Sequence, residues 1–306
     1  MSTSLERLWV PLVVPLLPDG EVDAHSLSNL VGYLTDSGTT GLWVNGTSGE
    51  FHALSIHERM RMVGLVAERA GDSALLVAQV GDSSLKTASE LAVEALAAGA
   101  DHIAALPPFY LAYGQDELAD YYRELAAVTE APVVLYDFPL HCKVALEPDL
   151  VLRLAREGIA SGIKQSSPSM ERFAEVTRAT DSWNFCCMHG ASARAAETLR
   201  LGGKGLVCAG ANLHPTAYLR TLDHARAGET DLAETASGEA SHIWDTLMSC
   251  LSDRDARTAP NVAGMKWALR RMGVIEHDTV RPPMAGLNPD ERARLESRVA
   301  HLLPAS

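Results

Sequence analysis

A single lysine at the end of a short apolar segment is the residue best suited to covalent chemistry in this sequence. Lys164 follows Ile159 and Ile163, which are separated by small residues, and it precedes Gln165 and two serines. Burial at a strand end disfavours the charged form of an ammonium and frees the amine lone pair for attack on a carbonyl. We therefore expect Lys164 to form a Schiff base with a carbonyl substrate. A surface lysine at a strand edge is the commoner situation.

Two hydroxyl side chains lie in a tight turn flanked by glycines. Gly46, Thr47, Ser48 and Gly49 follow a predicted strand over residues 41–45. Backbone N–H groups and hydroxyls in such a turn can bind a carboxylate without any formal positive charge. An ordinary turn with a hydroxyl-to-backbone hydrogen bond explains the same residues, so the motif alone leaves both interpretations open.

Two tyrosines also follow predicted strands. Tyr136 ends an apolar strand over residues 132–136, and its phenol could relay protons if it lies near Lys164. The alternative for Tyr136 is a core ring whose hydroxyl is hydrogen-bonded. Tyr110 follows a Pro-Pro-Phe sequence and fits either a pocket lid or an oligomer contact.

His141 and His189 follow strand ends as well, but neither belongs to a metal-binding motif. The sequence has no H-x-H after the first strand and no H-E-x-x-H. We therefore expect no metal and no organic cofactor. Both histidines are interpreted as structural residues or as residues that tune specificity.

The elements that must position these residues alternate between short apolar segments and longer segments of helical period. Helices are predicted after Asp23, after a capping box at Ser55 to Glu58, over about 84–98 and over about 115–129. Strands are predicted over residues 9–15, 41–45, 74–80, 102–106, 132–136, a sixth that ends at Lys164, 184–188 and 205–209.

Eight strands with a helix between each pair predict parallel β/α units, and at this chain length they predict an α/β fold of the (β/α)8 TIM barrel type. The alternative is a doubly wound open sheet. That fold would need a glycine-rich turn after the first strand, and residues 11–20 contain no G-x-G-x-x-G. In a barrel, the residues that follow the strands share one mouth, so we expect Thr47, Ser48, Tyr110, Tyr136 and Lys164 to meet there.

The last third of the chain has a helical pattern only. Helices are predicted near residues 215–227, 230–251, 258–272 and 289–302. No linker rich in glycine, serine or proline precedes them. We therefore interpret residues 1–213 as the barrel, and residues 214–306 as the last barrel helix and a C-terminal helical extension of the same structural unit.

The composition excludes several classes of protein. The chain has 306 residues, of which 47% are hydrophobic and 21% charged, as in ordinary globular proteins. A net charge of -13 argues against a general binder of nucleic acid or anionic membranes. No apolar run is long enough to span a bilayer, and residues 1–7 lack the pattern of a secretory signal. The odd number of cysteines, five, predicts reduced thiols, and together these features predict a cytoplasmic protein.

Several ordered motifs resemble the dihydrodipicolinate synthase/N-acetylneuraminate lyase family of class I aldolases. The resemblance covers nearly the whole chain. Its motifs are L-L-P-D-G-E-V-D at 16–23, G-T-S-G-E-F at 46–51, P-P-F-Y at 107–110, L-Y-D-F-P at 135–139, G-I-K-Q at 162–165, the segment 202–212, and V-R-P-P at 280–283.

The resemblance implies a (β/α)8 barrel with C-terminal helices, and a homotetramer built from dimers. It implies that Lys164 forms the Schiff base with pyruvate or another 2-oxo acid. Tyr136 would be the phenol that relays protons, and Thr47 with Ser48 would hold the α-carboxylate. Thr47 therefore counts as both a catalytic and a substrate-binding candidate, and Gly46 belongs to the same turn.

Three further positions match pocket residues of the family. Tyr110 matches the tyrosine that reaches the neighbouring subunit's site in the synthase branch. Gly190 and Val207 match positions that line the pocket.

The positions that would bind the second substrate depart from the family pattern. His141 stands where synthases of lysine biosynthesis carry an arginine, so the planar fork that would bind a second carboxylate is missing. Ala191 and Ser192 stand where sialic acid lyases place acidic residues. Asp137 replaces a more usual asparagine.

We therefore predict a Schiff-base aldolase or lyase that forms or cleaves a C–C bond between pyruvate and an aldehyde. Its substrates would be 4-hydroxy-2-oxo acids, such as 2-keto-3-deoxy sugar acids. One alternative is a 4-hydroxy-tetrahydrodipicolinate synthase, which condenses pyruvate with aspartate semialdehyde, with His141 or Lys143 in place of the arginine. The others are a Schiff-base dehydratase of a keto-deoxy sugar acid and a binding protein that retains the pocket without turnover.

Overall fold

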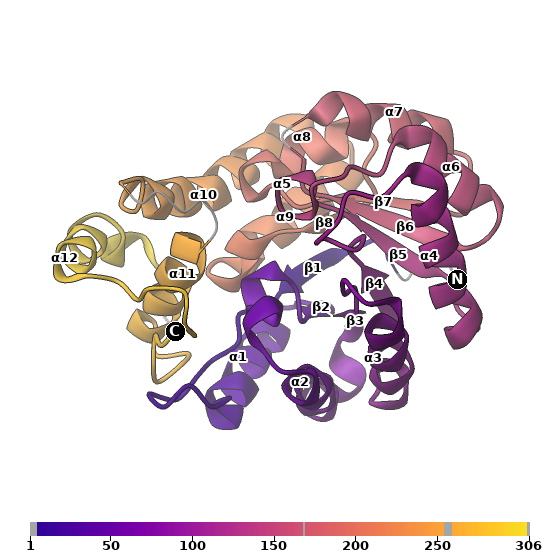
Figure 1. Cartoon of the computed structure of the whole chain (residues 1–306). Coiled ribbons are helices and arrows are strands. Elements are labelled where there is room, and N and C mark those ends of the chain that lie inside the picture. Colours follow the sequence, from indigo (N-terminus) through magenta and orange to yellow (C-terminus); the bar gives the residue numbers. More distant parts are fainter. Residues whose placement is uncertain (1–4, 168, 254–258, 305–306) are drawn as a thin grey trace.

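The computed structural model describes residues 5–167, 169–253 and 259–304, within which eight parallel strands form a closed barrel (Figure 1). Each strand pairs with the next, and β8 pairs with β1 to close the sheet. The predicted TIM barrel is thus confirmed. The strands are β1 (Leu8–Pro11), β2 (Gly41–Val44), β3 (Leu75–Gln79), β4 (His102–Ala105), β5 (Val133–Asp137), β6 (Ala160–Gln165), β7 (Cys186–His189) and β8 (Gly205–Val207).

Helices surround the barrel, and the last ones lie beside it as an extension (Figure 1). The helices that follow the strands are α1 (Ala24–Asp36), α2 (Ile56–Ala70), α3 (Leu85–Ala97), α4 (Gln115–Thr129), α5 (Pro139–Cys142), α6 (Pro148–Arg156), α7 (Met170–Thr180), α8 (Ala195–Arg200) and α9 (Pro215–Arg226). The extension contains α10 (Thr230–Ser249), α11 (Ala259–Arg271) and α12 (Pro289–Arg298).

Local sequence signals fix the starts of the first two helices. The Asp23 side chain accepts a hydrogen bond from the Ser26 N–H at 3.0 Å and caps α1. Ser55 and Glu58 form the predicted capping box of α2, in which each side chain accepts from the other residue's backbone N–H. A cap of this kind typically contributes about 1 kcal/mol to helix stability.

Alternate residues of each strand face two different cores. In β2, Leu42 and Val44 pack in the large cluster between the strands and the helices, whereas Trp43 packs in a second cluster inside the barrel. Trp9 and Tyr136 share that inner cluster and are also buried. This period of two is what a pleated strand imposes, and the bulky rings fill the barrel so that it is a packed core.

The predicted strands differ from the observed ones mainly at their ends. The predicted first strand ran to residue 15, but β1 ends at Pro11. The segment from there to Pro15 is also buried and apolar, so its sequence looks like more of the strand, but it does not extend the sheet. Conversely, β7 extends to His189, one residue beyond the prediction. Residues 1–4 and residue 258, to which sequence predictions also refer, lie outside the described residues.

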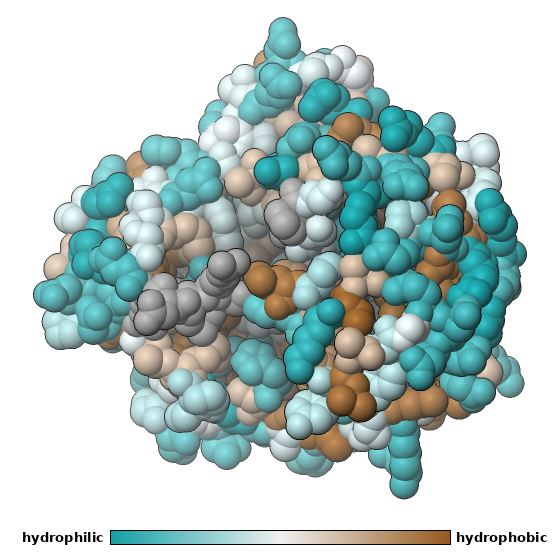
Figure 2. Space-filling model, turned by 45° about the horizontal axis from the view of Figure 1, so that its top comes forward, coloured by the Kyte–Doolittle hydropathy of each residue, from teal (hydrophilic) through white to brown (hydrophobic). Residues whose placement is uncertain are grey.

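Two global predictions can be compared with the structure. All five cysteines are buried and free. Among the described residues, no helix combines the length and the apolar character needed to cross a membrane. The face in Figure 2 is mostly hydrophilic, with hydrophobic residues scattered between polar ones.

Candidate active site

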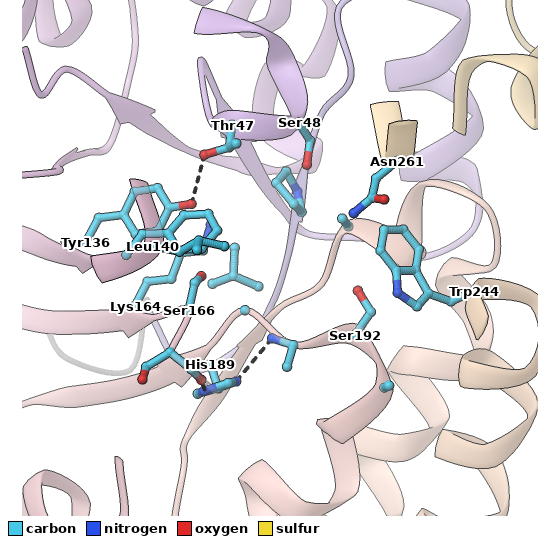
Figure 3. A pocket seen from close by; sticks show the side chains of 18 of the residues that line it. Thr47, Ser48, Tyr136, Leu140, Lys164, Ser166, His189, Ser192, Trp244 and Asn261 are labelled. Atoms are coloured by element: carbon cyan, nitrogen blue, oxygen red, sulfur yellow. Dashed lines mark hydrogen bonds between the residues drawn. The ribbon is translucent and has the colours of Figure 1, made fainter. Parts of the chain in front are cut away.

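A cavity of about 460 Å³ lies at the C-terminal ends of the strands, where a barrel places its loops (Figure 3). Its volume is within the range of roughly 300–1,000 Å³ that is usual for small-molecule sites. Six predicted site residues line it. They are Thr47, Ser48, Tyr136, Lys164, Gly190 and Val207.

Lys164 lies at the inner end of this cavity, against two aromatic rings. It is the penultimate residue of β6, directly beside Tyr136 of β5 in the strand register, and only 4% of it is exposed. Its Nζ lies 3.9 Å from the centre of the Tyr136 ring and 4.9 Å from that of Trp43. The amine is therefore screened from bulk water by the barrel core and opens only toward the cavity.

A pair of hydroxyls lies beside the amine. The Thr47 Oγ1 is 3.1 Å from the Tyr136 hydroxyl, and either group can be the donor (Figure 3). Thr47 begins the short 3-10 turn η2 (Thr47–Gly49), which Gly46 starts by accepting a hydrogen bond from the Gly49 N–H. This turn holds the threonine over the phenol, so the two hydroxyls form a short path along which a proton can move.

Gly190 leaves room for the side chains of Lys164 and Ser166 to pack closely against it. A Cβ at this position would lie 3.2 Å from Cε of Lys164 and would overlap the Ser166 hydroxyl. Ser166 itself lines the cavity one residue beyond the end of β6. Ser166 was not among the predicted site residues, although its place two residues after Lys164 was the signal that could have identified it.

His189 is a buried, neutral ring in the cavity wall. Its Nε2 lies 3.1 Å from the Ser167 carbonyl oxygen, and its Nδ1 accepts from the Ala191 N–H at 3.1 Å. These two bonds require a proton on Nε2 and none on Nδ1. Burial lowers the pKa of His189 to about 4. The ring thus joins the loops after β6 and β7 and adds no charge to the site.

Asp137 has a structural position behind the cavity. It is fully buried, accepts from the Leu146 N–H at 3.0 Å, and lies 3.4 Å from Nε2 of Gln165. Burial raises the pKa of Asp137. The carboxyl group therefore fastens the segment after α5 to the end of β6, which accounts for its presence without a catalytic role.

Three predicted site residues lie outside the cavity of their own chain. Gly46 packs behind the turn against the Trp43 ring. His141 lies in α5 with its ring 4.3 Å from that of Phe138, and it is exposed. Tyr110 is 75% exposed, and its carbonyl oxygen accepts from Lys143 Nζ at 2.9 Å. A contribution of Tyr110 to a neighbouring subunit's site stays a prediction.

The C-terminal extension supplies cavity residues that sequence reasoning did not identify. Trp244 comes from α10, and Asn261 and Met265 come from α11. Figure 3 shows Trp244 and Asn261 across the cavity from Lys164. Strand-end position could not reveal them, because they lie on helices far along the chain from any strand.

A buried ion pair connects this extension to the turn of residues 46–49 that carries Thr47 and Ser48, which we call the hydroxyl turn. Glu50, which directly follows the turn, is fully buried and pairs with the equally buried Lys266 of α11. Glu50 also accepts from the Arg281 N–H at 3.0 Å, and Lys266 donates to the Thr279 carbonyl at 2.7 Å. The position of α11 is therefore coupled directly to that of the turn that carries Thr47.

Arg281 extends the same connection to the start of α2. Its guanidinium pairs with Glu58 at 2.7 Å, and this hydrogen-bonded partner lowers the pKa of Glu58 to about 2. The V-R-P-P motif and the capping box, which are far apart in the sequence, thus meet beside the hydroxyl turn.

The sequence of this chain is similar to those of known proteins of nearly the same length. The model of the dihydrodipicolinate synthetase family matches residues 4–302. A 4-hydroxy-tetrahydrodipicolinate synthase of Laribacter hongkongensis (strain HLHK9) is 30% identical over 288 residues, which cover 94% of this chain and 95% of the relative.

Two solved structures superpose on nearly the whole chain. A dihydrodipicolinate synthase from Bacteroides thetaiotaomicron has a TM-score of 0.89 at 30% identity, covering 96% of this chain and 97% of its own. YagE, a prophage protein of E. coli K12 in the dihydrodipicolinic acid synthase family, was solved in complex with pyruvate. It has a TM-score of 0.89 at 25% identity, with the same coverage.

Proposed function

The chain belongs to the dihydrodipicolinate synthetase family, and from this premise we propose that it is a class I lyase that forms or cleaves a carbon–carbon bond between pyruvate and an aldehyde. The observation that carries the proposal is the buried Lys164 amine beside the Tyr136–Thr47 hydroxyl pair. The pyruvate complex of YagE supports pyruvate as the oxo acid.

The cleavage reaction begins with binding and Schiff-base formation. The hydroxyls of Thr47 and Ser48, with the N–H groups of their turn, bind the carboxylate of a 4-hydroxy-2-oxo acid. This places the C2 carbonyl next to Lys164. The amine adds to C2, and loss of water from the carbinolamine gives an iminium.

The iminium is the electron sink for bond cleavage. The Tyr136 hydroxyl accepts the proton of the 4-hydroxyl as its own proton passes to Thr47, and the aldehyde leaves as the C3–C4 electron pair moves toward the iminium nitrogen. This gives an enamine of pyruvate. Protonation of the enamine at C3 and addition of water at C2 then release pyruvate and restore the lysine. Thr47 passes protons between Tyr136 and the open side of the cavity.

The cavity favours a 4-hydroxy-2-oxo acid of the 2-keto-3-deoxy sugar acid type over the adduct of aspartate semialdehyde. Among the described residues that line it, Lys164 is the only lysine or arginine, and the His189 ring is neutral. A second carboxylate would therefore enter without an ionic partner, which costs several kcal/mol when water is excluded. A dehydratase that uses the same lysine would fit the same cavity.

The Laribacter relative's name makes the synthase reaction the second candidate function. Parallel assays of pyruvate with D-glyceraldehyde and with aspartate semialdehyde separate the two. We expect the higher kcat/KM with D-glyceraldehyde. A higher value with aspartate semialdehyde would establish the synthase reaction instead.

We infer the assembly from the family resemblance and from exposed apolar side chains, and propose a homotetramer built from two dimers. Tyr110 and Leu111 are 75% and 56% exposed, and both lie near the cavity's end of the barrel after β4. Sedimentation equilibrium should give four times the chain mass. A monomer would contradict this proposal.

A further inference from the structure

Asn261 and Trp244 form the wall of the cavity that lies opposite Lys164 (Figure 3). Both side chains are partly exposed to the cavity. Neither has a hydrogen-bond partner within the part of the chain that the structure describes. Unpaired polar groups at the wall of a site are free to bind a ligand.

The two side chains offer complementary contacts. An asparagine amide presents one acceptor and two donors, and an indole presents one N–H donor and a flat apolar face. Ser192 lines the cavity beside them and adds a hydroxyl. This set suits a carbon chain that carries hydroxyl groups on one side and C–H bonds on the other.

The wall carries no formal charge in the described residues. Its other members, Val262 and Met265, are apolar, and Met265 lies one helical turn after Asn261, so both face the cavity. The next residue, Lys266, points away into its buried pair with Glu50. That pair fixes α11 against the hydroxyl turn and so fixes the distance between Asn261 and Ser48.

We propose that Asn261 and Trp244 select the aldehyde, and that they take a neutral, hydroxyl-bearing one. Asn261 hydrogen-bonds the hydroxyl groups, and Trp244 covers the C–H face of the chain. The proposal rests on the proposed lyase function, because it concerns the half of the substrate that does not bond to Lys164. It assigns specificity to the C-terminal extension.

The test compares two three-carbon aldehydes that differ in their hydroxyls. The kcat/KM for addition of pyruvate is measured with D-glyceraldehyde and with propanal, and the ratio reports hydroxyl recognition. Replacing Asn261→Leu keeps the size of the side chain and removes its hydrogen bonds, so we expect the ratio to fall about fivefold to tenfold. Asn29→Leu, at an exposed position on α1, is the matched control and should leave the ratio unchanged.

Three further variants keep the test independent of folding. Asn261→Asp retains the shape and an acceptor, so the ratio should stay within about threefold of wild type, whereas kcat/KM for aspartate semialdehyde should fall at least fivefold by charge repulsion. Trp244→Ala should lower kcat/KM for D-glyceraldehyde at least tenfold, and Trp244→Phe should restore most of it.

Borohydride trapping of pyruvate is the accompanying control for the proposed function. Each Asn261 and Trp244 variant should be trapped on Lys164 to the wild-type extent, because pyruvate binds on the other side of the cavity. Normal trapping with an unchanged aldehyde ratio in Asn261→Leu would overturn the assignment of the wall. No trapping in the wild-type protein would instead overturn the lyase function itself.

Discussion

At the residue scale, the proposed reaction depends on contacts among Lys164, Tyr136 and Thr47, which the structure places side by side. The Tyr136 ring shields the amine at 3.9 Å, and the Tyr136 hydroxyl lies 3.1 Å from Thr47. The amine attacks a ketone through its nitrogen lone pair, whereas the phenol must exchange protons with the groups around it. The hydrogen bond between Thr47 and the Tyr136 hydroxyl provides a partner for that exchange, while the Tyr136 ring stays in contact with Lys164.

Removing only the phenol oxygen separates these two roles. Tyr136→Phe keeps the ring against Lys164, so trapping of pyruvate should persist. The proton transfer is lost, and we expect kcat to fall about 10²- to 10³-fold. Steady-state kinetics with pyruvate and D-glyceraldehyde provide the measurement. Tyr113→Phe, outside the cavity, is the control, and an unchanged kcat in Tyr136→Phe would exclude the relay.

His189 makes stability depend on pH. Burial lowers its pKa from 6.5 to about 4 in the folded protein, so the unfolded chain binds the proton first as the pH falls. Stability that is present above pH 6.5 is therefore lost as the pH approaches 4, by about 3 kcal/mol. Urea unfolding at several pH values measures this loss.

A variant without the imidazole identifies the source of that loss. His189→Gln should be less stable than wild type at pH 7, because one of the bonds to the loops is lost, but its stability should decline less between pH 6.5 and 4. His57→Gln, at an exposed position of α2, serves as the control. An equal decline in His189→Gln and wild type would assign the acid sensitivity to other groups.

At the scale of the elements, α11 and the hydroxyl turn behave as one piece because Glu50 and Lys266 pair between them without access to water. The turn also ends in a backbone conformation that is uncommon for residues other than glycine, since Glu50 adopts a positive φ of 53°. Removing one partner leaves the other charge buried, and the cost of such a loss is much larger than the net contribution of the pair.

The double-mutant cycle on this pair is a direct test. Lys266→Met should destabilise the protein by about 3–5 kcal/mol, because Glu50 stays buried without its ammonium partner. The double variant Glu50→Gln with Lys266→Met should recover a large part of that loss, since no unpaired charge is left. Chemical unfolding of the wild type, the two single variants and the double variant gives the cycle. Additive losses would show that the two residues are not coupled.

The expected meeting of Lys164, Tyr136 and Thr47 at one mouth agrees with their positions in the cavity, because a closed barrel brings the ends of all its strands to the same side. Their catalytic roles stay predictions. The strand pattern could not decide which of the residues that follow the strands turn inward. Tyr110 follows β4 and His141 follows β5, yet both lie outside the cavity of their chain. The path of a loop after a strand depends on packing between loops, which leaves no periodic pattern in the sequence.

At the scale of the whole molecule, the cavity lies between a barrel and a helical extension. The apolar period of residues 230–251 and 258–272 predicted helices there but not which face would meet the barrel. Trp244 and Asn261 could therefore be identified as cavity residues only from the three-dimensional structure. The barrel supplies Lys164, Tyr136 and Thr47 to the cavity, and the extension supplies the wall opposite them.

The central claim is that Lys164 bonds covalently to pyruvate, and borohydride reduction of the intact protein tests it most directly. The full-length chain is incubated with pyruvate, reduced, digested and examined by mass spectrometry. We predict a pyruvate adduct on Lys164 that depends on both pyruvate and borohydride and is absent from Lys164→Arg. Turnover with no adduct on Lys164, or an adduct on another lysine such as Lys143 or Lys266 instead, would contradict the account.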